Sequence, residues 1–310
     1  IARGITLSAT GATARDGNPC FTISDFGEGQ TPDMMPFTFL SLIRSNKLRI
    51  PFVQGKFNMG GTGVLKFCGR HNLQLVVSRR NPALVDLHVS SSSDTAWGFT
   101  IVRREDPEGN RRSSVYLYLA PYDAEAKPGK GGVLRFNASR LPIFPEGREP
   151  YAKESEWGTL IKLYEYMATG YKTHILRKDG LLSRVDLLLP DVALPIRFHE
   201  CRQGYRGHEG SFETTLTGVT VRLEEDRSEN LEPDFPSSCQ MSAQGEQIVA
   251  TIYAFKKGRA DTYRKNEGII FTLNGQTHGG LPLDFFRRKN VGLSYLADSI
   301  LVVADCSRFS

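Results

Sequence analysis

An aspartate followed by two glycines at alternate positions comes directly after a predicted strand near the start of the chain. The residues are Asp25, Gly27 and Gly29, in the segment Ile-Ser-Asp-Phe-Gly-Glu-Gly. A carboxylate accepts hydrogen bonds, so at this place it can bind an amino group of a ligand, and glycines let the backbone approach closely. The same residue types also form tight turns after strands. This segment alone leaves a binding site and a simple turn as alternatives.

A second candidate site is a glycine-rich segment that begins 30 positions after the aspartate. From Gly55 to Gly63 the chain reads Gly-Lys-Phe-Asn-Met-Gly-Gly-Thr-Gly, and it continues into Val64–Phe67, where a helix is predicted to start. The N–H groups of such a loop can surround phosphate oxygens, and the positive end of a following helix favours negative charge. A flexible linker is the alternative, but linkers rarely lead straight into an apolar helix start. We favour a phosphate-binding loop.

Two common nucleotide-binding motifs do not account for this segment. A Walker A loop needs Gly-Lys followed by Ser or Thr, whereas Gly129-Lys130 is followed by Gly131. A dinucleotide-binding Gly-x-Gly-x-x-Gly needs a third glycine where this chain has Lys66. A different phosphate-binding arrangement is therefore expected.

The order of these motifs resembles the GHKL (Bergerat-fold) ATPase superfamily, which includes gyrase, heat-shock chaperone ATPases, histidine kinases, MutL and MORC proteins. Asp25 and its glycines resemble the family's adenine-binding motif, and the glycine-rich segment resembles its ATP lid. Gly158-Thr159-Leu160-Ile161 resembles the motif whose threonine helps to hold the aspartate and the adenine. The resemblance implies binding of ATP with Mg²⁺. It assigns nucleotide contacts to Asp25, Gly27, Gly29, Gly55, Lys56, Gly60, Gly61, Thr62, Gly63 and Thr159.

The family's general-base glutamate and magnesium-binding asparagine belong to a helix that precedes the first strand. This chain begins at Ile1, just before its first predicted strand, so the resemblance places both residues upstream of Ile1. For the full-length protein it implies Mg²⁺-dependent ATP hydrolysis that drives lid closure and a conformational change or dimerisation. A non-hydrolysing, nucleotide-responsive interaction module, or a DNA-associated scaffold, is the alternative. A Glu-x-x-x-Asn pattern upstream would support hydrolysis.

The second half of the chain resembles the transducer domain that follows the ATPase domain in the gyrase and MutL branches. Ile269–Gln276 reads as a strand with an Asn-Gly turn, and a helix at Leu283–Leu296 with a strand at Ile300–Ala304 would complete a strand-helix-strand crossover. We therefore expect an ATP-binding domain in residues 1–190 and a transducer-like domain in residues 191–310, both cut from a longer protein. The phosphate-contacting lysine of the transducer has three weak candidates, for which solvated surface charge is the preferred interpretation: Lys256, Lys257 and Lys289.

Hydrophobic patterning predicts the elements that position these motifs. Strands are expected at Gly4–Ser8, Cys20–Ser24, Leu73–Val77, Leu84–Val89, Gly98–Arg103, Ser114–Ala120, Gly158–Leu163, Leu194–Cys201, Thr214–Leu223, Gln247–Phe255, Gly268–Leu273 and Ile300–Ala304. Helices are expected at Phe37–Ser45, from Gly63 to Cys68, at His174–Leu189 and at Leu283–Leu296, with a loop at Glu224–Ser238. The predicted fold is α+β: a Bergerat-type α/β sandwich, with a mixed, largely antiparallel sheet and helices on one face, followed by a second α+β domain.

Composition restricts the class of protein. With 310 residues, the chain exceeds the roughly 100–200 residues of one domain, which favours two. No stretch approaches the roughly 18–20 apolar residues that cross a bilayer, and no signal region opens the chain, so we expect no membrane partner and a cytoplasmic location. A net charge of +5 permits nucleic-acid binding without requiring it. The five cysteines are scattered, with no Cys-x-x-Cys pair, so neither a disulfide framework nor a zinc ribbon is indicated.

Other chemistries have weaker support. His199, Cys201 and His208 are zinc-ligand types, but their spacing matches no zinc motif, so ordinary hydrogen bonding is the preferred interpretation. No Gly-x-Ser-x-Gly motif accompanies the histidines, which leaves a hydrolase triad unsupported. Alternating aromatic residues around Trp97 and Tyr116 are more typical of a sheet core than of base stacking.

Overall fold

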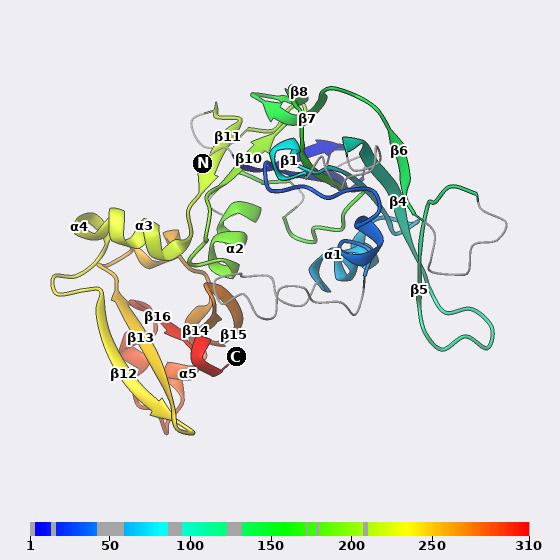
Figure 1. Ribbon diagram of the computed structural model, residues 1–310. Helices are drawn as coiled ribbons and strands as arrows, with labels where there is room; N and C mark the ends of the chain where they lie inside the picture. Colours follow the sequence, from blue (N-terminus) through cyan, green and yellow to red (C-terminus); the bar gives the residue numbers. More distant parts are fainter. Residues whose placement is uncertain are drawn as a thin grey trace. The chain divides into compact units, whose positions relative to one another are not determined.

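The computed structural model describes residues 4–13, 17–41, 59–85, 95–122, 132–171, 173–177, 180–206 and 210–309. These residues form two compact units (Figure 1). The first unit comprises the described residues up to Leu176 together with Ile196–Thr215, and the second comprises Arg177–Pro195 and the chain from Leu216 onward. The functional division predicted at residue 190 stays a prediction.

The first unit is built on a nine-stranded sheet with strand order β11-β10-β1-β2-β9-β3-β4-β5, in which β6 also pairs with β4. All pairs whose register is resolved are antiparallel except β1 with β10, which is parallel. The strands are β1 (Ile5–Gly11), β2 (Pro19–Asp25), β3 (Leu73–Arg79), β4 (Trp97–Glu105), β5 (Val115–Tyr118), β6 (Leu134–Phe136), β9 (Gly158–Leu163), β10 (Ile196–Glu200) and β11 (Glu213–Leu216). The predicted mixed, largely antiparallel sheet is confirmed.

One face of this sheet, face A, carries Asp25, Thr159 and Ser78, which are register partners on β2, β9 and β3. Because side chains alternate along a strand, Val76 and Val102 lie on the same face. They form a buried cluster with Met35 and Leu65, which come from short 3₁₀ helices at Met35–Phe37 (η1) and Val64–Phe67 (η2). Helical elements therefore cover face A.

The opposite face, face B, carries Ser24, Leu160 and Val77 and is covered by a β-hairpin. The hairpin consists of β7 (Leu141–Glu146) and β8 (Glu149–Ser155). Its residues Ile143 and Phe144 pack with Leu160 in a second buried cluster. The Ser24 hydroxyl donates a 2.6 Å hydrogen bond to the Ile143 carbonyl, which fixes the hairpin to β2.

The second unit contains a five-stranded sheet with strand order β12-β13-β16-β14-β15. Its strands are β12 (Ser237–Ala243), β13 (Glu246–Ala254), β14 (Glu267–Leu273), β15 (Gln276–Pro282) and β16 (Ile300–Asp305), and its helices are α2 (Leu181–Leu188), α3 (Val219–Glu225), α4 (Arg227–Asn230) and α5 (Asp284–Arg287). Strands β14 and β16 are parallel, as the predicted strand-helix-strand crossover requires. Asn274 and Gly275 both have positive φ in the turn between β14 and β15, which confirms the predicted Asn-Gly turn.

Helices lie on both faces of this second sheet. Leu187 of α2 and Val219 of α3 join Ile270 in one buried cluster, whereas Phe286 of α5 joins Ile269 in another. Ile269 and Ile270 are consecutive strand residues and so point to opposite faces. The second unit is thus an α+β body with three layers, and the prediction of a second α+β domain is confirmed in that coarse form.

Several predicted elements differ in the structure. The strand predicted at Thr214–Leu223 is wrong beyond Leu216, because Val219 and Leu223 are four residues apart on one buried face of helix α3. The helix predicted at Leu283–Leu296 is split into α5 and a 3₁₀ turn at Ser294–Leu296 (η7), with Gly292 at φ 68° between them. The helix predicted from His174 begins only at Leu181, after Gly180.

The remaining differences concern loops. The helix predicted from Phe37 is wrong over its first residues: η1 ends at Phe37, and residues 42–45 lie outside the described ranges. The strand predicted at Leu84–Val89 starts in a 3₁₀ turn, Pro82–Leu84 (η3), and residues 86–89 lie outside the described ranges. The predicted loop at Glu224–Ser238 contains α4 and the start of β12.

Candidate functional site

The predicted adenine-binding aspartate is the last residue of β2. Asp25 is partly buried, and its Oδ1 accepts a 2.8 Å hydrogen bond from the Gly27 amide. A Cβ atom at Gly27 would stand 2.7 Å from the same Oδ1. Glycine at this position therefore lets the chain turn tightly enough for its amide to hold the carboxylate.

Thr159 lies directly opposite Asp25 on β9, so both side chains share face A. Thr159 is buried, and its hydroxyl is 3.0 Å from the Ser78 hydroxyl on the next strand. Ser78 Oγ also accepts a hydrogen bond from the Gln30 amide at 2.9 Å. Asp25, Thr159 and Ser78 thus form a polar row across three neighbouring strands. The loop after Asp25 contacts the Ser78 end of this row through the Gln30 amide.

Ser78 was not among the predicted site residues. The available signal is its position in β3, where a serine follows the apolar alternation of Leu73–Val77 and is completely buried. A buried hydroxyl at the end of an apolar strand indicates a hydrogen-bonded role, because unpaired buried polar groups are rare. Its partners, Thr159 and Gln30, come from distant parts of the sequence.

The position of Gly29 requires glycine for a reason that does not involve a ligand. Its φ is +66°, and a Cβ atom there would stand 1.8 Å from the Arg79 carbonyl oxygen. The neighbouring Glu28 makes two contacts with the residues just after β3: its carbonyl accepts a hydrogen bond from the Asn81 amide at 2.7 Å, and its carboxylate pairs with Arg80 at 2.7 Å. The loop after β2 is therefore packed closely against the end of β3.

The predicted ATP lid falls only partly within the described residues. Gly55 and Lys56 lie outside them. Gly60, Gly61, Thr62 and Gly63 belong to a short helix, α1 (Met59–Gly63), that leads directly into η2. Leu65 of η2 packs on face A, so the end of this segment lies on the same sheet face as Asp25 and Thr159. Thr62 is buried, whereas the three glycines have open space where a Cβ would be.

The three candidates for the phosphate-contacting lysine have the environments expected of surface lysines. Lys256 Nζ donates a 2.6 Å hydrogen bond to the Ser228 carbonyl, and Lys257 and Lys289 are exposed. Within the described ranges no three His, Cys, Asp or Glu side chains form a metal-binding group. His208 lies outside those ranges, and His199 is bound by hydrogen bonds in the first unit's sheet. None of the helices in the described part of the chain is long and apolar enough to cross a bilayer.

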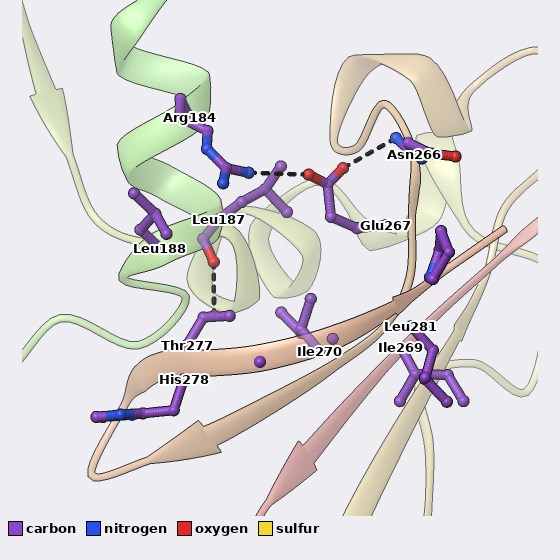
Figure 2. Close-up of a pocket in the computed structure, with 13 residues that line it drawn as sticks. Arg184, Leu187, Leu188, Asn266, Glu267, Ile269, Ile270, Thr277, His278 and Leu281 are labelled. Atoms are coloured by element: carbon purple, nitrogen blue, oxygen red, sulfur yellow. Dashed lines mark hydrogen bonds and ion pairs between the residues drawn. The ribbon is translucent and has the colours of Figure 1, made fainter.

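The second unit contains a cavity of about 400 Å³ between α2 and the β14–β15 hairpin (Figure 2). Arg184 of α2 pairs with Glu267 of β14 at 3.1 Å, and the Thr277 hydroxyl donates to the Leu187 carbonyl at 2.7 Å. The other lining residues shown are mainly aliphatic, such as Leu188 and Leu281. Both polar contacts join α2 to the hairpin, so they stabilise the unit.

Glu267 is held in its charged form. Burial alone would raise the pKa of its carboxyl, but hydrogen bonds from the backbone amides of Lys265, Glu267 and Asn266, together with the Arg184 charge, outweigh this effect. The pKa of Glu267 is therefore lower than its ordinary value, and the residue favours folding as a carboxylate.

Comparisons with known proteins give structural similarities only. No protein-family model matches the chain, and no curated protein matches its sequence. The B-subunit of the DNA gyrase from Myxococcus xanthus is 12% identical over 98% of this chain and 73% of that chain, with a TM-score of 0.39. The 43K ATPase domain of Thermus thermophilus gyrase B, in complex with an aminocoumarin, is 12% identical over 97% of this chain and 70% of that chain, with a TM-score of 0.36. Scores of this size do not establish a common fold.

Proposed function

We propose that this chain binds ATP on face A of its first unit, with Asp25 recognising the adenine. The observation that supports this most is the polar row itself, which sets a carboxylate beside two hydroxyls on adjacent strands, Thr159 and Ser78. A carboxylate accepts hydrogen bonds and an adenine amino group donates them. The resemblance of the sequence motifs to the GHKL superfamily gives nucleotide-binding roles to Asp25 and Thr159, but none to Ser78.

An adenine whose 6-amino group faces Asp25 fits these residues, whereas a guanine held in the same orientation does not. The Gly27 amide fixes Asp25 Oδ1, so the carboxylate has a defined orientation at the strand end. The base that it meets must present a donor, and adenine has its amino group at the position where guanine has a carbonyl oxygen. For a base bound with its 6-position toward Asp25, the chain should therefore prefer ATP to GTP, because a carboxylate facing a carbonyl leaves two acceptors unpaired.

The test is calorimetric titration of ATP and GTP, with and without Mg²⁺, into the unmodified chain and into Asp25→Asn. We expect ATP to bind at least about tenfold more tightly than GTP, and Asp25→Asn to weaken ATP binding by at least about tenfold, since each loses a charged hydrogen bond. Asp106→Asn, an exposed ion-pair residue on another turn, is the matched control. Equal ATP affinities for the chain and Asp25→Asn, or no ATP binding at all, would refute the proposal.

Hydrolysis, lid closure and dimerisation are further parts of the same proposal for the full-length protein. The described residues that carry this proposal, Asp25, Thr159 and Ser78, recognise the nucleotide. If the extended protein binds ATP but releases no phosphate above background, the non-hydrolysing interaction module becomes the better description. Sedimentation of the chain with and without ATP tests dimerisation. Titration with DNA or a partner protein, with and without ATP, tests those interactions.

A further inference from the structure

A second polar cavity lies in the first unit, on the sheet face opposite Asp25 and Thr159. Its volume is about 190 Å³, and it is lined by residues of β1, β7, β8, β10 and β11 and by Phe26, which follows β2. Thr6 of β1 and Arg197 of β10 are register partners and lie beside Ser24, so they belong to face B. The β7–β8 hairpin covers this part of the sheet.

Thr6 gives the cavity a buried hydroxyl that its own chain does not use. The residue is 4% exposed, and its Oγ1 has no hydrogen-bond partner in the part of the chain that the structure describes. The hydroxyls of Ser8 and Thr10, on the same face of β1, also have no hydrogen-bond partner in the described chain, but they do not line the cavity. Buried polar groups are nearly always paired, so an orphaned hydroxyl that lines a cavity indicates a polar ligand there.

Charged side chains surround this hydroxyl. Arg197 donates to Glu213 at 2.5 Å and to the Thr215 hydroxyl at 2.6 Å, and the buried His199 has its Nδ1 3.4 Å from Glu213. These contacts order the β10 and β11 side of the cavity. On the hairpin side, Glu146 and Lys153 are exposed, and their side chains form no ion pair or hydrogen bond within the described chain.

The remaining wall is aromatic. Phe26 stacks on Phe144 with ring centroids 3.8 Å apart and an interplanar angle of 15°. Phe144 is buried, which holds the pair in place, and Phe26 keeps 37% of its surface exposed. An apolar group of a ligand can therefore pack on Phe26 while its polar groups meet the charged side.

We propose that this cavity binds a free α-amino acid with an apolar side chain. Lys153 and Arg197 carry two positive charges and Glu146 and Glu213 two negative charges, so a zwitterion preserves the balance that an anion or an amine alone would disturb. The ligand carboxylate takes the donors of Thr6, Arg197 and Lys153, and its ammonium group takes Glu146. A cavity of about 190 Å³ is smaller than the about 300–1,000 Å³ of sites for drug-sized molecules, which suits a ligand of this size.

Calorimetric titration with three matched probes tests the assignment. L-leucine carries both charged groups, 4-methylpentanoate lacks the ammonium group, and 3-methylbutylamine lacks the carboxylate. We expect L-leucine to bind and each analogue to bind at least about tenfold more weakly, because each loses a charged hydrogen bond. Thr6→Val and Glu146→Gln should each weaken L-leucine binding by about tenfold. Glu149→Gln changes an exposed glutamate of the same hairpin that does not line the cavity, and should have no effect.

Several outcomes would overturn the proposal. Equal binding of L-leucine and 4-methylpentanoate would show a general anion site, and unchanged affinity in Glu146→Gln would remove the ammonium contact. No binding of L-leucine, L-valine or L-phenylalanine would show that the cavity takes no apolar amino acid. Glu146 is exposed, so its variant tests the idea even if Thr6→Val fails to fold. Asp25→Asn should leave L-leucine binding intact, which separates this site from the proposed ATP site.

Discussion

At the scale of single residues, the two glycines after Asp25 serve different purposes. Gly27 allows its own amide to reach the Asp25 carboxylate, whereas Gly29 allows the loop to touch the backbone of Arg79. Only the first is tied directly to the proposed adenine contact. The glycines of such a motif therefore have a packing explanation as well as a ligand-binding one, and variants must separate the two.

Gly29→Ala should destabilise the first unit by about 2 kcal/mol or more, since a non-glycine residue at positive φ costs about 1–3 kcal/mol and the new Cβ would collide with the Arg79 carbonyl. Gly60→Ala is the matched control. Gly60 lies in α1 with open space where a Cβ would be, so alanine there should be neutral or stabilising by up to about 1 kcal/mol. Denaturant unfolding of both variants measures the difference, and equal stabilities would contradict the packing of this loop.

Sequence reasoning proposed Asp25, its glycines and Thr159 as site residues because each belongs to a short local pattern. It missed Ser78 and Thr6, whose importance depends on partners far away in the chain. Ser78 meets Thr159, 81 residues later, and Thr6 lies beside Arg197 on a strand that is adjacent only in the folded sheet. Single polar residues inside strands carry no local signal that distinguishes a ligand contact from an internal hydrogen bond.

At the scale of elements, most strands of both sheets were predicted, because apolar alternation is a direct consequence of one buried face. The β7–β8 hairpin was not predicted, since only β7 carries a buried apolar run and β8 is exposed along most of its length. Helix α3 was predicted as a strand because Val219, Thr220 and Val221 are β-branched, and burial of Val219 and Leu223 on one face outweighed that preference. In both cases tertiary packing decided the outcome.

The junction between α2 and β14 should make the second unit sensitive to acid. The pKa of Glu267 is lower in the folded chain than in the unfolded one, so its contribution to stability is complete above the unfolded pKa of about 4.3 and is lost as pH falls through the folded value. Glu267→Gln should lower the melting temperature near neutral pH and reduce its fall between about pH 7 and about pH 3.

Glu246→Gln provides the comparison for this measurement, because Glu246 is an exposed residue at the start of β13 in the same unit. Its melting curve should follow that of the unmodified chain across the same pH range. If Glu267→Gln also kept the full acid sensitivity, the hydrogen bonds from Lys265 and Asn266 would not be contributing as the geometry indicates.

At the scale of the whole molecule, the first unit is assembled from two separated parts of the chain. Strand β10 pairs in parallel with β1, although Ile196 and Ile5 are 191 positions apart in sequence. Between them the chain contributes α2 to the second unit. The predicted boundary after Pro190 would separate β10 and β11 from the sheet to which they belong.

Two truncations test this arrangement. A chain ending after Pro190 should fail to unfold cooperatively, because β1 would lose its partner β10 and present an unpaired edge beside the buried hydroxyls Thr6, Ser8 and Thr10 of face B. A chain ending after Leu216 retains β10 and β11 and should show a cooperative transition by circular dichroism. Cooperative unfolding of the shorter chain would show that the parallel pair is dispensable.

The parallel pairing of β1 with β10 also sets the order of events while the protein is being made. On the ribosome, β1 and β2 emerge before β10, and about two hundred further residues must be made before the edge of β1 can be closed. At about 5–20 residues per second this interval lasts roughly 10–40 s, during which the exposed strand is available to other nascent chains. Dependence on a chaperone during synthesis would be a direct result of that topology.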